Sequence, residues 1–249
     1  MKTLETDLLV IGAGSGGLSV AAGAVQMGAR VVLLEAGEMG GDCLNYGCVP
    51  SKALIASASV AHQMRHAQAY GIANVEPQVD YAAAQSHVAD VIAQIAPVDS
   101  QERFESLGVT VIRAHGRFVS DREVEAGDTR ITARRIVVAT GSSPLVPPIP
   151  GLDTVPYLTN ESLWEQAERP DHLLIIGGGP IGLEMAHAHR RLGSQVTVFE
   201  GAQALSKDDP ELAAIVLDNL RGEGIQIAEN ATASKIHGPA GAIPVAPAD

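Results

Sequence analysis

The sequence predicts an α/β fold with two parallel sheets, because one strand–helix–strand pattern occurs twice. Residues 7–37 (DLLVIGAGSGGLSVAAGAVQMGARVVLLEAG) align without gaps with residues 172–202 (HLLIIGGGPIGLEMAHAHRRLGSQVTVFEGA). Each copy reads as a buried strand, a glycine-rich turn, a helix and a second strand. A glutamate ends the second strand of each copy, 23 residues after the first glycine of the turn. Together these features are typical of two Rossmann-like dinucleotide-binding domains.

The two glycine turns are the candidate nucleotide-binding sites. Glycine has no Cβ, so the backbone can approach a pyrophosphate, whose charge meets the N–H groups at the start of the following helix. The two glutamates are expected to accept hydrogen bonds from ribose hydroxyls. The alternative, two tight turns that bind nothing, explains the glycines but not both acids. The predicted binding residues are Gly12, Gly14, Gly17 and Glu35 in the first copy, and Gly177, Gly179, Gly182 and Glu200 in the second.

Glu200 also predicts which nucleotide the second copy prefers. Its carboxylate would repel a 2′-phosphate, and no arginine lies between Glu200 and Arg221 to attract one. We therefore expect the second copy to bind NAD rather than NADP.

The segment between the two copies is predicted to be helical first and then β-stranded. Helical patterns cover residues 51–66 and 81–108, the second interrupted or kinked at Pro97. A short antiparallel insertion is expected from residues 109–118, 122–126 and 129–133.

The remaining elements define the domain boundary. Residues 134–143 read as a return to a buried strand that ends at Gly141, and the proline-rich residues 144–151 as a linker. The predicted domains are therefore residues 1–150 and 151–249. The second domain is expected to continue with a helix over 209–221, a strand over 224–228 and a loose tail over 238–249.

Composition restricts the classes of partner. The 249 residues are 46% hydrophobic and carry a formal net charge of −12 without a basic block, which argues against a nucleic-acid or anionic-membrane partner. The first apolar run is too short for a signal sequence, so a cytoplasmic location is expected. In a reducing cytosol, two cysteines are more often free, metal-bound or redox-active than a structural disulfide.

Both cysteines lie in the segment GGDCLNYGCVPSK, residues 40–52. On an ideal helix, residues five apart have Cα atoms more than ~8 Å apart, whereas a disulfide needs about 7 Å or less. Cys43 and Cys48 can therefore pair only across irregular backbone, which Asn45 and Gly47 permit. Cys48 is expected near a helix N-terminus with Lys52 one turn later, an environment that stabilises a thiolate.

Three readings of the cysteines remain open at this point. A redox-active pair fits the spacing and the helix start. A two-cysteine metal site would need further ligands, such as His62 and His66, and no metal site is predicted. A structural disulfide or two buried thiols is the third reading.

Four segments carry a resemblance to a known family: residues 40–52, GAGSGG (12–17), VVATGSSPLVPPIPG (137–151) and GGGPIGLEMAHAHRRLGSQVTVFE (177–200). They are similar to the class I pyridine nucleotide–disulfide oxidoreductases, which include dihydrolipoamide dehydrogenase, mercuric reductase and glutathione reductase. The resemblance implies an FAD site and an NAD site. It implies FAD contacts from Gly12, Gly14, Gly17, Glu35, Gly41, Asp42, the backbone near Gly116, and Thr140, Gly141 and Ser142.

The resemblance also implies roles for four residues. Cys48 would be the charge-transfer thiol against the flavin, and Cys43 the interchange thiol that meets the substrate. Lys52 would lie by flavin N5, paired with Glu184. Electrons would pass from NADH through FAD to the Cys43–Cys48 disulfide, and on to a disulfide, a metal ion or another small acceptor.

The sequence also departs from the family pattern. Asp42 and Tyr46 replace a usual Thr and a usual small apolar residue. No segment after Glu229 matches the family's later flavin-binding strand, its dimerisation domain or its His–Glu pair, although full-length members are expected to be homodimers. His62, His66 and His87 are interpreted as solvated helix positions, and His187 and His189 as ordinary helix residues. The alternative function is a truncated, non-catalytic dinucleotide-binding module.

Overall fold

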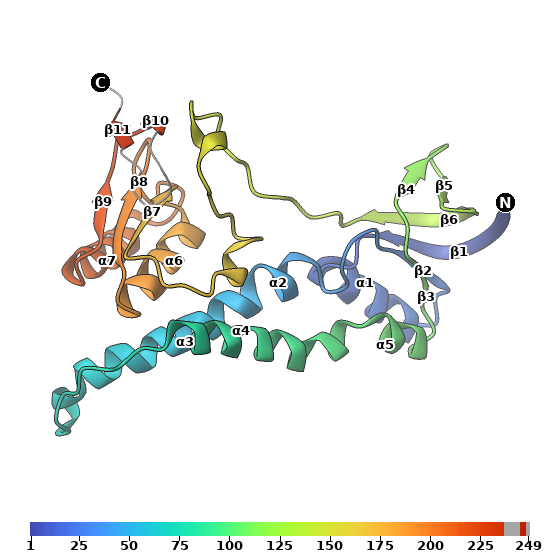
Figure 1. The fold of residues 1–249 in the computed structure, drawn as a ribbon. Helices are drawn as coiled ribbons and strands as arrows, with labels where there is room; N and C mark the ends of the chain where they lie inside the picture. Colours follow the sequence, from blue (N-terminus) through green and yellow to red (C-terminus); the bar gives the residue numbers. More distant parts are fainter. Residues whose placement is uncertain (237–244, 248–249) are drawn as a thin grey trace. The chain divides into compact units, whose positions relative to one another are not determined.

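The computed structural model describes residues 1–236 and 245–247 and contains two compact units (Figure 1). Unit 1 comprises Met1–Pro50 and Ala89–Pro144, and unit 2 comprises Ser51–Val88 and Leu145–Asp249. The helices α3 (Cys48–Arg65) and α4 (Tyr81–Ile95) carry the chain across the boundaries. The division of the sequence at residue 150 stays a prediction.

Unit 1 is built on a six-stranded sheet with the order β3-β2-β1-β6-β5-β4. The first four strands in this order are parallel, and β5 and β4 continue the sheet antiparallel. The strands are β1 (Lys2–Ile11), β2 (Val31–Leu34), β3 (Thr110–Ile112), β4 (Gly116–Phe118), β5 (Glu123–Ala126) and β6 (Thr129–Val138). The helices within this unit are α1 (Ser15–Gln26), α2 (Gly41–Asn45) and α5 (Gln101–Ser106).

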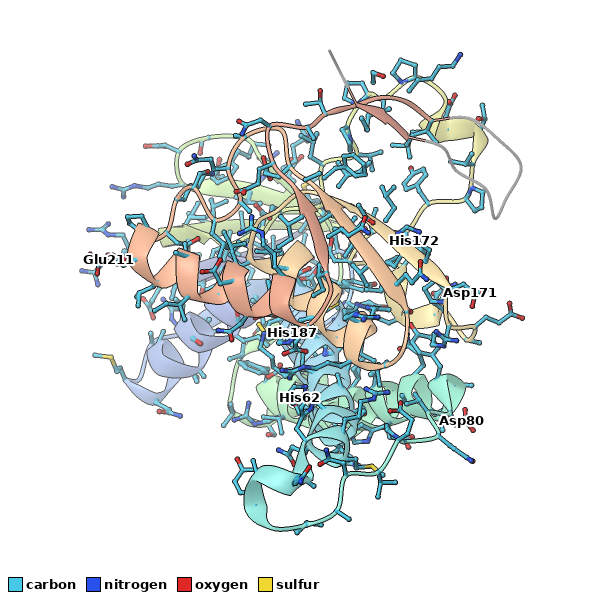
Figure 2. All side chains as sticks on the ribbon, turned by 90° about the vertical axis from the view of Figure 1, so that its left-hand side faces the viewer. His62, Asp80, Asp171, His172, His187 and Glu211 are labelled. Atoms are coloured by element: carbon cyan, nitrogen blue, oxygen red, sulfur yellow. The ribbon has the colours of Figure 1, made fainter. Side chains whose placement is uncertain are left out.

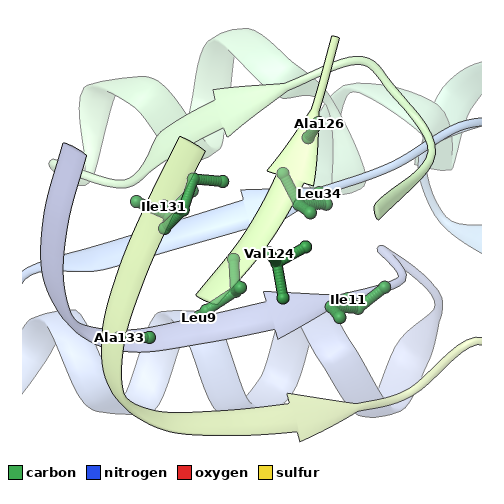
Figure 3. Packing of buried hydrophobic residues seen from close by; sticks show 8 residues of the cluster. Leu9, Ile11, Leu34, Val124, Ala126, Ile131 and Ala133 are labelled. Carbon is green, nitrogen blue, oxygen red and sulfur yellow. The ribbon is translucent and has the colours of Figure 1, made fainter. Parts of the chain in front are cut away.

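Both faces of this sheet are covered, because alternate residues of β1 and β2 point to opposite sides. On one side, Leu9, Ile11 and Leu34 pack with Val124 of β5 and Ile131 of β6, as Figure 3 shows. On the other side, the strands pack against α1 and α5 in a second core that includes Val10, Leu18, Ala21, Leu33 and Phe104. The near-continuous apolar pattern of these strands follows from this double burial.

The structure corrects the predicted antiparallel insertion in two respects. The start of residues 109–118 forms β3, which pairs parallel with β2 and therefore belongs to the main sheet. Residues 129–138 form one continuous strand, β6, which pairs with β1 along its length and with β5 only at its start. The strand predicted to end at Gly141 therefore ends at Val138, and its last five residues are exposed or half-buried rather than buried.

Unit 2 repeats the same architecture on a smaller scale, with a parallel sheet of order β7-β8-β9. Its strands are β7 (His172–Ile176), β8 (Gln195–Phe199) and β9 (Gln226–Ala228), and its later helices are α6 (Pro180–Arg191) and α7 (Pro210–Gly222). One core joins both helices to the sheet through Leu183, Ala186, Val198, Leu217 and Leu220. The predicted α/β fold with two Rossmann-like sheets is confirmed.

Short elements complete the chain. Single 3-10 turns occupy Ala67–Tyr70, Ala96–Asp99, Leu152–Thr154 and Leu163–Glu165. The turn at Ala96–Asp99 separates α4 from α5, so the predicted interruption at Pro97 is confirmed. The predicted loose tail is wrong in part, because Val245–Pro247 form β11 and pair antiparallel with β10 (Ala233–Ile236). Residues 238–244 and 248–249 of that predicted tail lie outside the described residues.

Candidate functional site

The first glycine turn connects β1 to α1 and is shaped by close backbone contacts. Gly12 has a φ of +104°, which favours glycine, and a Cβ there would overlap the carbonyl oxygen of Ala139. A Cβ on Gly17 would overlap the carbonyl oxygen of Gly12, so α1 starts directly against the turn. The N-cap of α1 is Gly14, which provides no side-chain cap, and the first helical turn has no acidic residue. The N-terminal amides of α1 thus face a position that suits an anion.

The Gly40–Gly41 pair brings the cysteine segment against this turn. Gly40 donates its N–H to the carbonyl of Ala13 at 2.9 Å and forms a bridge with Gly14. Gly41 has a φ of +58°, and a Cβ on it would lie 2.6 Å from the Cα of Gly14. Only glycine permits this approach, so α2 and its cysteine start beside the glycine turn.

The second glycine turn, between β7 and α6, repeats the first. Gly177 has a φ of +116°, and a Cβ on Gly182 would overlap its carbonyl oxygen. Gly179 caps α6 without a side-chain hydrogen bond, and its Cβ position has no described atom within 4 Å. The space beside the helix start is therefore open on the side where a pyrophosphate is expected.

Each predicted glutamate contacts its own glycine turn. Glu35 accepts hydrogen bonds from the N–H of Ala13 at 2.6 Å and of Gly37 at 2.7 Å. Glu200 accepts hydrogen bonds from the N–H of Gly178 at 2.7 Å and of Ala202 at 3.0 Å. The carboxylate thus lies at the end of the second strand, next to the glycine turn, in both units.

The two cysteines lie on different helices, separated by irregular backbone. Cys43 is in the short helix α2, which the sequence analysis did not predict, and Cys48 is the first residue of α3. Asp42 accepts the N–H groups of Tyr46 and Gly47 on its carbonyl at 2.8 and 2.6 Å, which closes the turn between the helices. A Cβ on Gly47 would lie 2.7 Å from a carboxylate oxygen of Asp42, so glycine fits this turn. The expected break in the helix between the two cysteines is present.

Both cysteines are thiols in this structure, and they interact. Burial is the main cause that raises the pKa of Cys43 to about 11, and a hydrogen bond with Cys48 is the second. Cys43 is half-buried, whereas Cys48 is exposed. Two thiols within hydrogen-bonding reach can form a disulfide after a small local movement.

Polar side chains fix the segment that surrounds the cysteines. Asn45 donates to the carbonyls of Met39 at 3.1 Å and Gly41 at 2.9 Å, and the Tyr46 hydroxyl donates to Glu38 at 3.1 Å. Tyr46, a departure from the family pattern, is therefore anchored outside the turn.

Lys52 and Glu184 form an ion pair within unit 2. Lys52 Nζ lies 2.6 Å from Glu184 Oε2, and the two side chains are 60% and 41% exposed. Such an exposed pair contributes at most about 1 kcal/mol to stability, so its position matters more than its strength. Lys52 lies one turn after Cys48 on α3, and Glu184 lies in the second turn of α6 after the glycine turn.

The other predicted contacts differ in how closely they approach the first turn. Thr140 lies against the turn, because a Cβ on Gly12 would come within 3.1 Å of its Cα. Gly141, with a φ of +68°, and Ser142 follow in irregular backbone. Gly116 lies in β4, where a Cβ would be 2.9 Å from the end of the Leu34 side chain, so a larger residue would displace that side chain.

The sequence analysis missed a network of histidines around Glu223 in unit 2. Glu223 accepts two hydrogen bonds from Arg191, at 2.6 and 2.8 Å, and one contact from His187 at 2.9 Å. His62 of α3 lies 3.6 Å from the same carboxylate, and Figure 2 shows His62 and His187 on neighbouring helices. His62, expected to be a solvated helix position, is therefore half-buried beside Glu223, and His187 lies in helix α6 as expected. Together they connect α3, α6 and the end of α7.

His189, also a residue of α6, is fully buried, which the sequence analysis did not predict. Its Nδ1 lies 2.8 Å from the carbonyl of Met185, and its Nε2 lies 3.0 Å from the Tyr81 hydroxyl, which also accepts a hydrogen bond from Gln85. These contacts fit a neutral ring that donates from Nδ1 and accepts at Nε2. Burial lowers the pKa of His189, which agrees with the neutral form.

The part of the chain that the structure describes has neither a metal-binding cluster nor a membrane-crossing helix. Residues 1–236 and 245–247 contain no group of three or more His, Cys, Asp or Glu side chains arranged to hold a metal ion. Within the same ranges, no helix has the length and apolar character needed to cross a membrane.

Comparison with known proteins agrees with this geometry. Residues 6–246 match a family model described as pyridine nucleotide-disulphide oxidoreductase. The chain is 37% identical over 227 residues to a mercuric reductase of Streptomyces lividans, covering 89% of this chain and 48% of that protein. It is 34% identical over 233 residues to a mercuric reductase of Bacillus cereus, covering 93% of this chain and 37% of that protein. The chain thus spans half or less of the length of these relatives.

A solved structure of a flavoprotein disulfide reductase is also similar to this chain along almost its full length. A copper(II) complex of the HOCl-induced flavoprotein disulfide reductase RclA from Escherichia coli superposes with a TM-score of 0.80 at 28% identity. The match covers 97% of this chain and 52% of that one.

Proposed function

Because the chain belongs to the pyridine nucleotide-disulphide oxidoreductase family, we propose that it carries the nucleotide-binding and cysteine-containing part of a flavin-dependent disulfide oxidoreductase. The observation that supports this most strongly is the contact of Gly41 with Gly14. It places the first cysteine helix directly against a glycine turn that suits a pyrophosphate. In the proposed reaction, electrons pass from NADH by way of FAD to Cys43 and Cys48.

The first glycine turn suits the pyrophosphate of FAD. The turn presents the uncapped start of α1, whose first helical turn has no acidic residue, and Glu35 follows β2 beside the turn. We assign the FAD contacts to Gly12, Gly14, Gly17, Glu35 and the neighbouring Gly41, with Asp42, Gly116, Thr140, Gly141 and Ser142 as further members. FAD would supply the two-electron chemistry that links NADH to the cysteines.

The second turn suits NAD, with contacts from Gly177, Gly179, Gly182 and Glu200. The Glu200 carboxylate accepts the N–H of Gly178 in this turn, which supports a role in which it would meet the adenosine ribose and repel a 2′-phosphate. Arg221, the first arginine after Glu200, lies 2.7 Å from Glu229 and is therefore already paired. NAD is thus the preferred nucleotide in this proposal.

The two cysteines would have different tasks. In the reduced state, Cys43 attacks an acceptor disulfide after losing its proton, one acceptor thiolate leaves, and Cys48 then attacks the mixed disulfide. The second acceptor thiolate leaves, and a Cys43–Cys48 disulfide remains. Lys52, which forms an ion pair with Glu184, lies one helical turn after Cys48 on α3 and would lie by the flavin in this proposal.

The acceptor itself is proposed only as a class: a disulfide, a metal ion or another small molecule. A homodimer and a cytoplasmic location also remain predictions from the sequence.

Anaerobic mixing of NADH with the FAD-loaded chain tests the proposal. Loss of the oxidised flavin absorbance in wild type, with a different reduced spectrum in Cys48→Ser, would support it. Binding of both nucleotides without any flavin reduction would instead support a non-catalytic dinucleotide-binding module.

A further inference from the structure

Both glutamates that end the second strands join two loops of their own unit. In unit 1, one carboxylate oxygen of Glu35 accepts from Ala13 in the glycine turn, and the other accepts from Gly37 after β2. In unit 2, Glu200 joins Gly178 and Ala202 in the same manner. The repetition of this geometry in two separate units indicates a shared role.

The N–H group in the glycine turn depends on this carboxylate. Ala13 is fully buried and Gly178 is buried, and each follows a glycine with a positive φ. A buried N–H without a hydrogen-bond partner is destabilising, because it has lost its contact with water and gained nothing in exchange. By accepting this N–H, the carboxylate removes the unfavourable free energy that an unpaired amide in the bent turn would have.

The side chain at this position needs two acceptor oxygens. A carboxylate has about four lone-pair sites, of which the two N–H groups occupy two. The remaining sites are available to ribose hydroxyls. A glutamine would offer one oxygen, and its amide nitrogen would face an N–H donor.

We propose that Glu35 and Glu200 are positioning residues that hold their glycine turns in the binding conformation before any nucleotide is present. Each does so by linking the turn to the loop after the second strand. This role is separate from ribose recognition, and it rests on the proposed function only in that the same carboxylates would later contact the ribose.

Hydrogen–deuterium exchange on the nucleotide-free full chain tests this proposal, with Glu35→Gln and Glu200→Gln compared with wild type. We expect E200Q to accelerate exchange about tenfold at residues 177–183 only. E35Q should do the same at residues 12–18 only. A tenfold acceleration corresponds to a loss of ~1.4 kcal/mol in the free energy that protects these amides. Glu211→Gln, at an exposed position labelled in Figure 2, is the matched control and should change neither turn. Glu200→Asp keeps the charge but is one methylene shorter, so it should also accelerate exchange at residues 177–183. This variant provides the test if E200Q fails to fold.

NADH affinity, measured in parallel by fluorescence titration, separates this proposal from the proposed function. Unchanged exchange in E200Q and E200D together with weaker NADH binding would overturn the positioning role and leave ribose recognition intact. If E200Q and E200D exchange faster at the turn but the wild-type chain binds no NADH, the positioning role is supported and the proposed function is contradicted.

Discussion

Gly17→Ala and Gly16→Ala are adjacent changes in α1 that should have opposite effects on the stability of unit 1. A Cβ at position 17 would overlap the Gly12 carbonyl oxygen and lie 3.0 Å from its carbonyl carbon and 3.3 Å from Val10. A Cβ at position 16 would meet nothing within 4 Å. Both variants gain about 1 kcal/mol of helix propensity, so their difference isolates the steric conflict.

The conflict can be relieved only if α1 moves away from the strand, because the opposing atoms belong to the backbone. Such overpacking costs about 1–3 kcal/mol. We therefore expect G16A to be neutral or slightly stabilising and G17A to be about 1–3 kcal/mol less stable than G16A. Urea unfolding followed by far-UV circular dichroism measures both values. Equal midpoints and slopes for the two variants would refute the close approach of α1 to the turn.

Three further predictions concern unit 2. Burial alone would raise the pKa of Glu223, but hydrogen bonds from Arg191 and His187 lower it to about 2. Glu223→Gln should therefore lower the free energy of unfolding by about 1–2 kcal/mol at neutral pH. Because the pKa in the folded state lies below the ordinary 4.5, the difference from wild type, measured by urea unfolding, should fade as the pH falls from 4.5 toward 2. Tyr81→Phe removes the partner of buried His189 and should cost about 1–3 kcal/mol, whereas Tyr157→Phe at an exposed position should cost nothing measurable. Because burial lowers the pKa of His189, its contribution to wild-type stability should be lost as the pH falls below 6.5; stability that is flat between neutral and mildly acidic pH would contradict this. NADH should bind at least about tenfold more tightly than NADPH, and Glu200→Gln should reduce that ratio. Equal affinities in wild type would contradict the proposal that Glu200 repels the 2′-phosphate of NADPH.

The parts of the fold that were predicted correctly depend on local sequence patterns. The strand–turn–helix–strand units could be predicted because a positive φ at Gly12 and a close contact at Gly17 both require glycine, and the acid follows at a fixed spacing. The interruption at Pro97 could likewise be predicted from the loss of one backbone donor.

The parts that were missed depend on contacts between distant segments. The pairing of β3 with β2 is decided by the sheet, because a short apolar run carries no signal for its partner. His62 and Glu223 meet although α3 and the end of α7 lie far apart in the sequence, and neither residue has a distinctive local pattern. The short helix α2 was missed because the contact between Gly41 and Gly14 determines its start.

Counting thiols in the air-oxidised, FAD-loaded chain before and after one equivalent of NADH, without oxygen, tests the central claim most directly. Alkylation followed by peptide mapping assigns each thiol to its position. The account predicts that NADH exposes two new thiols, at Cys43 and Cys48, and that NADPH does so much more slowly. If both cysteines are already free in the oxidised protein, or if both stay blocked after the flavin is reduced, then the proposal that electrons reach this cysteine pair is contradicted.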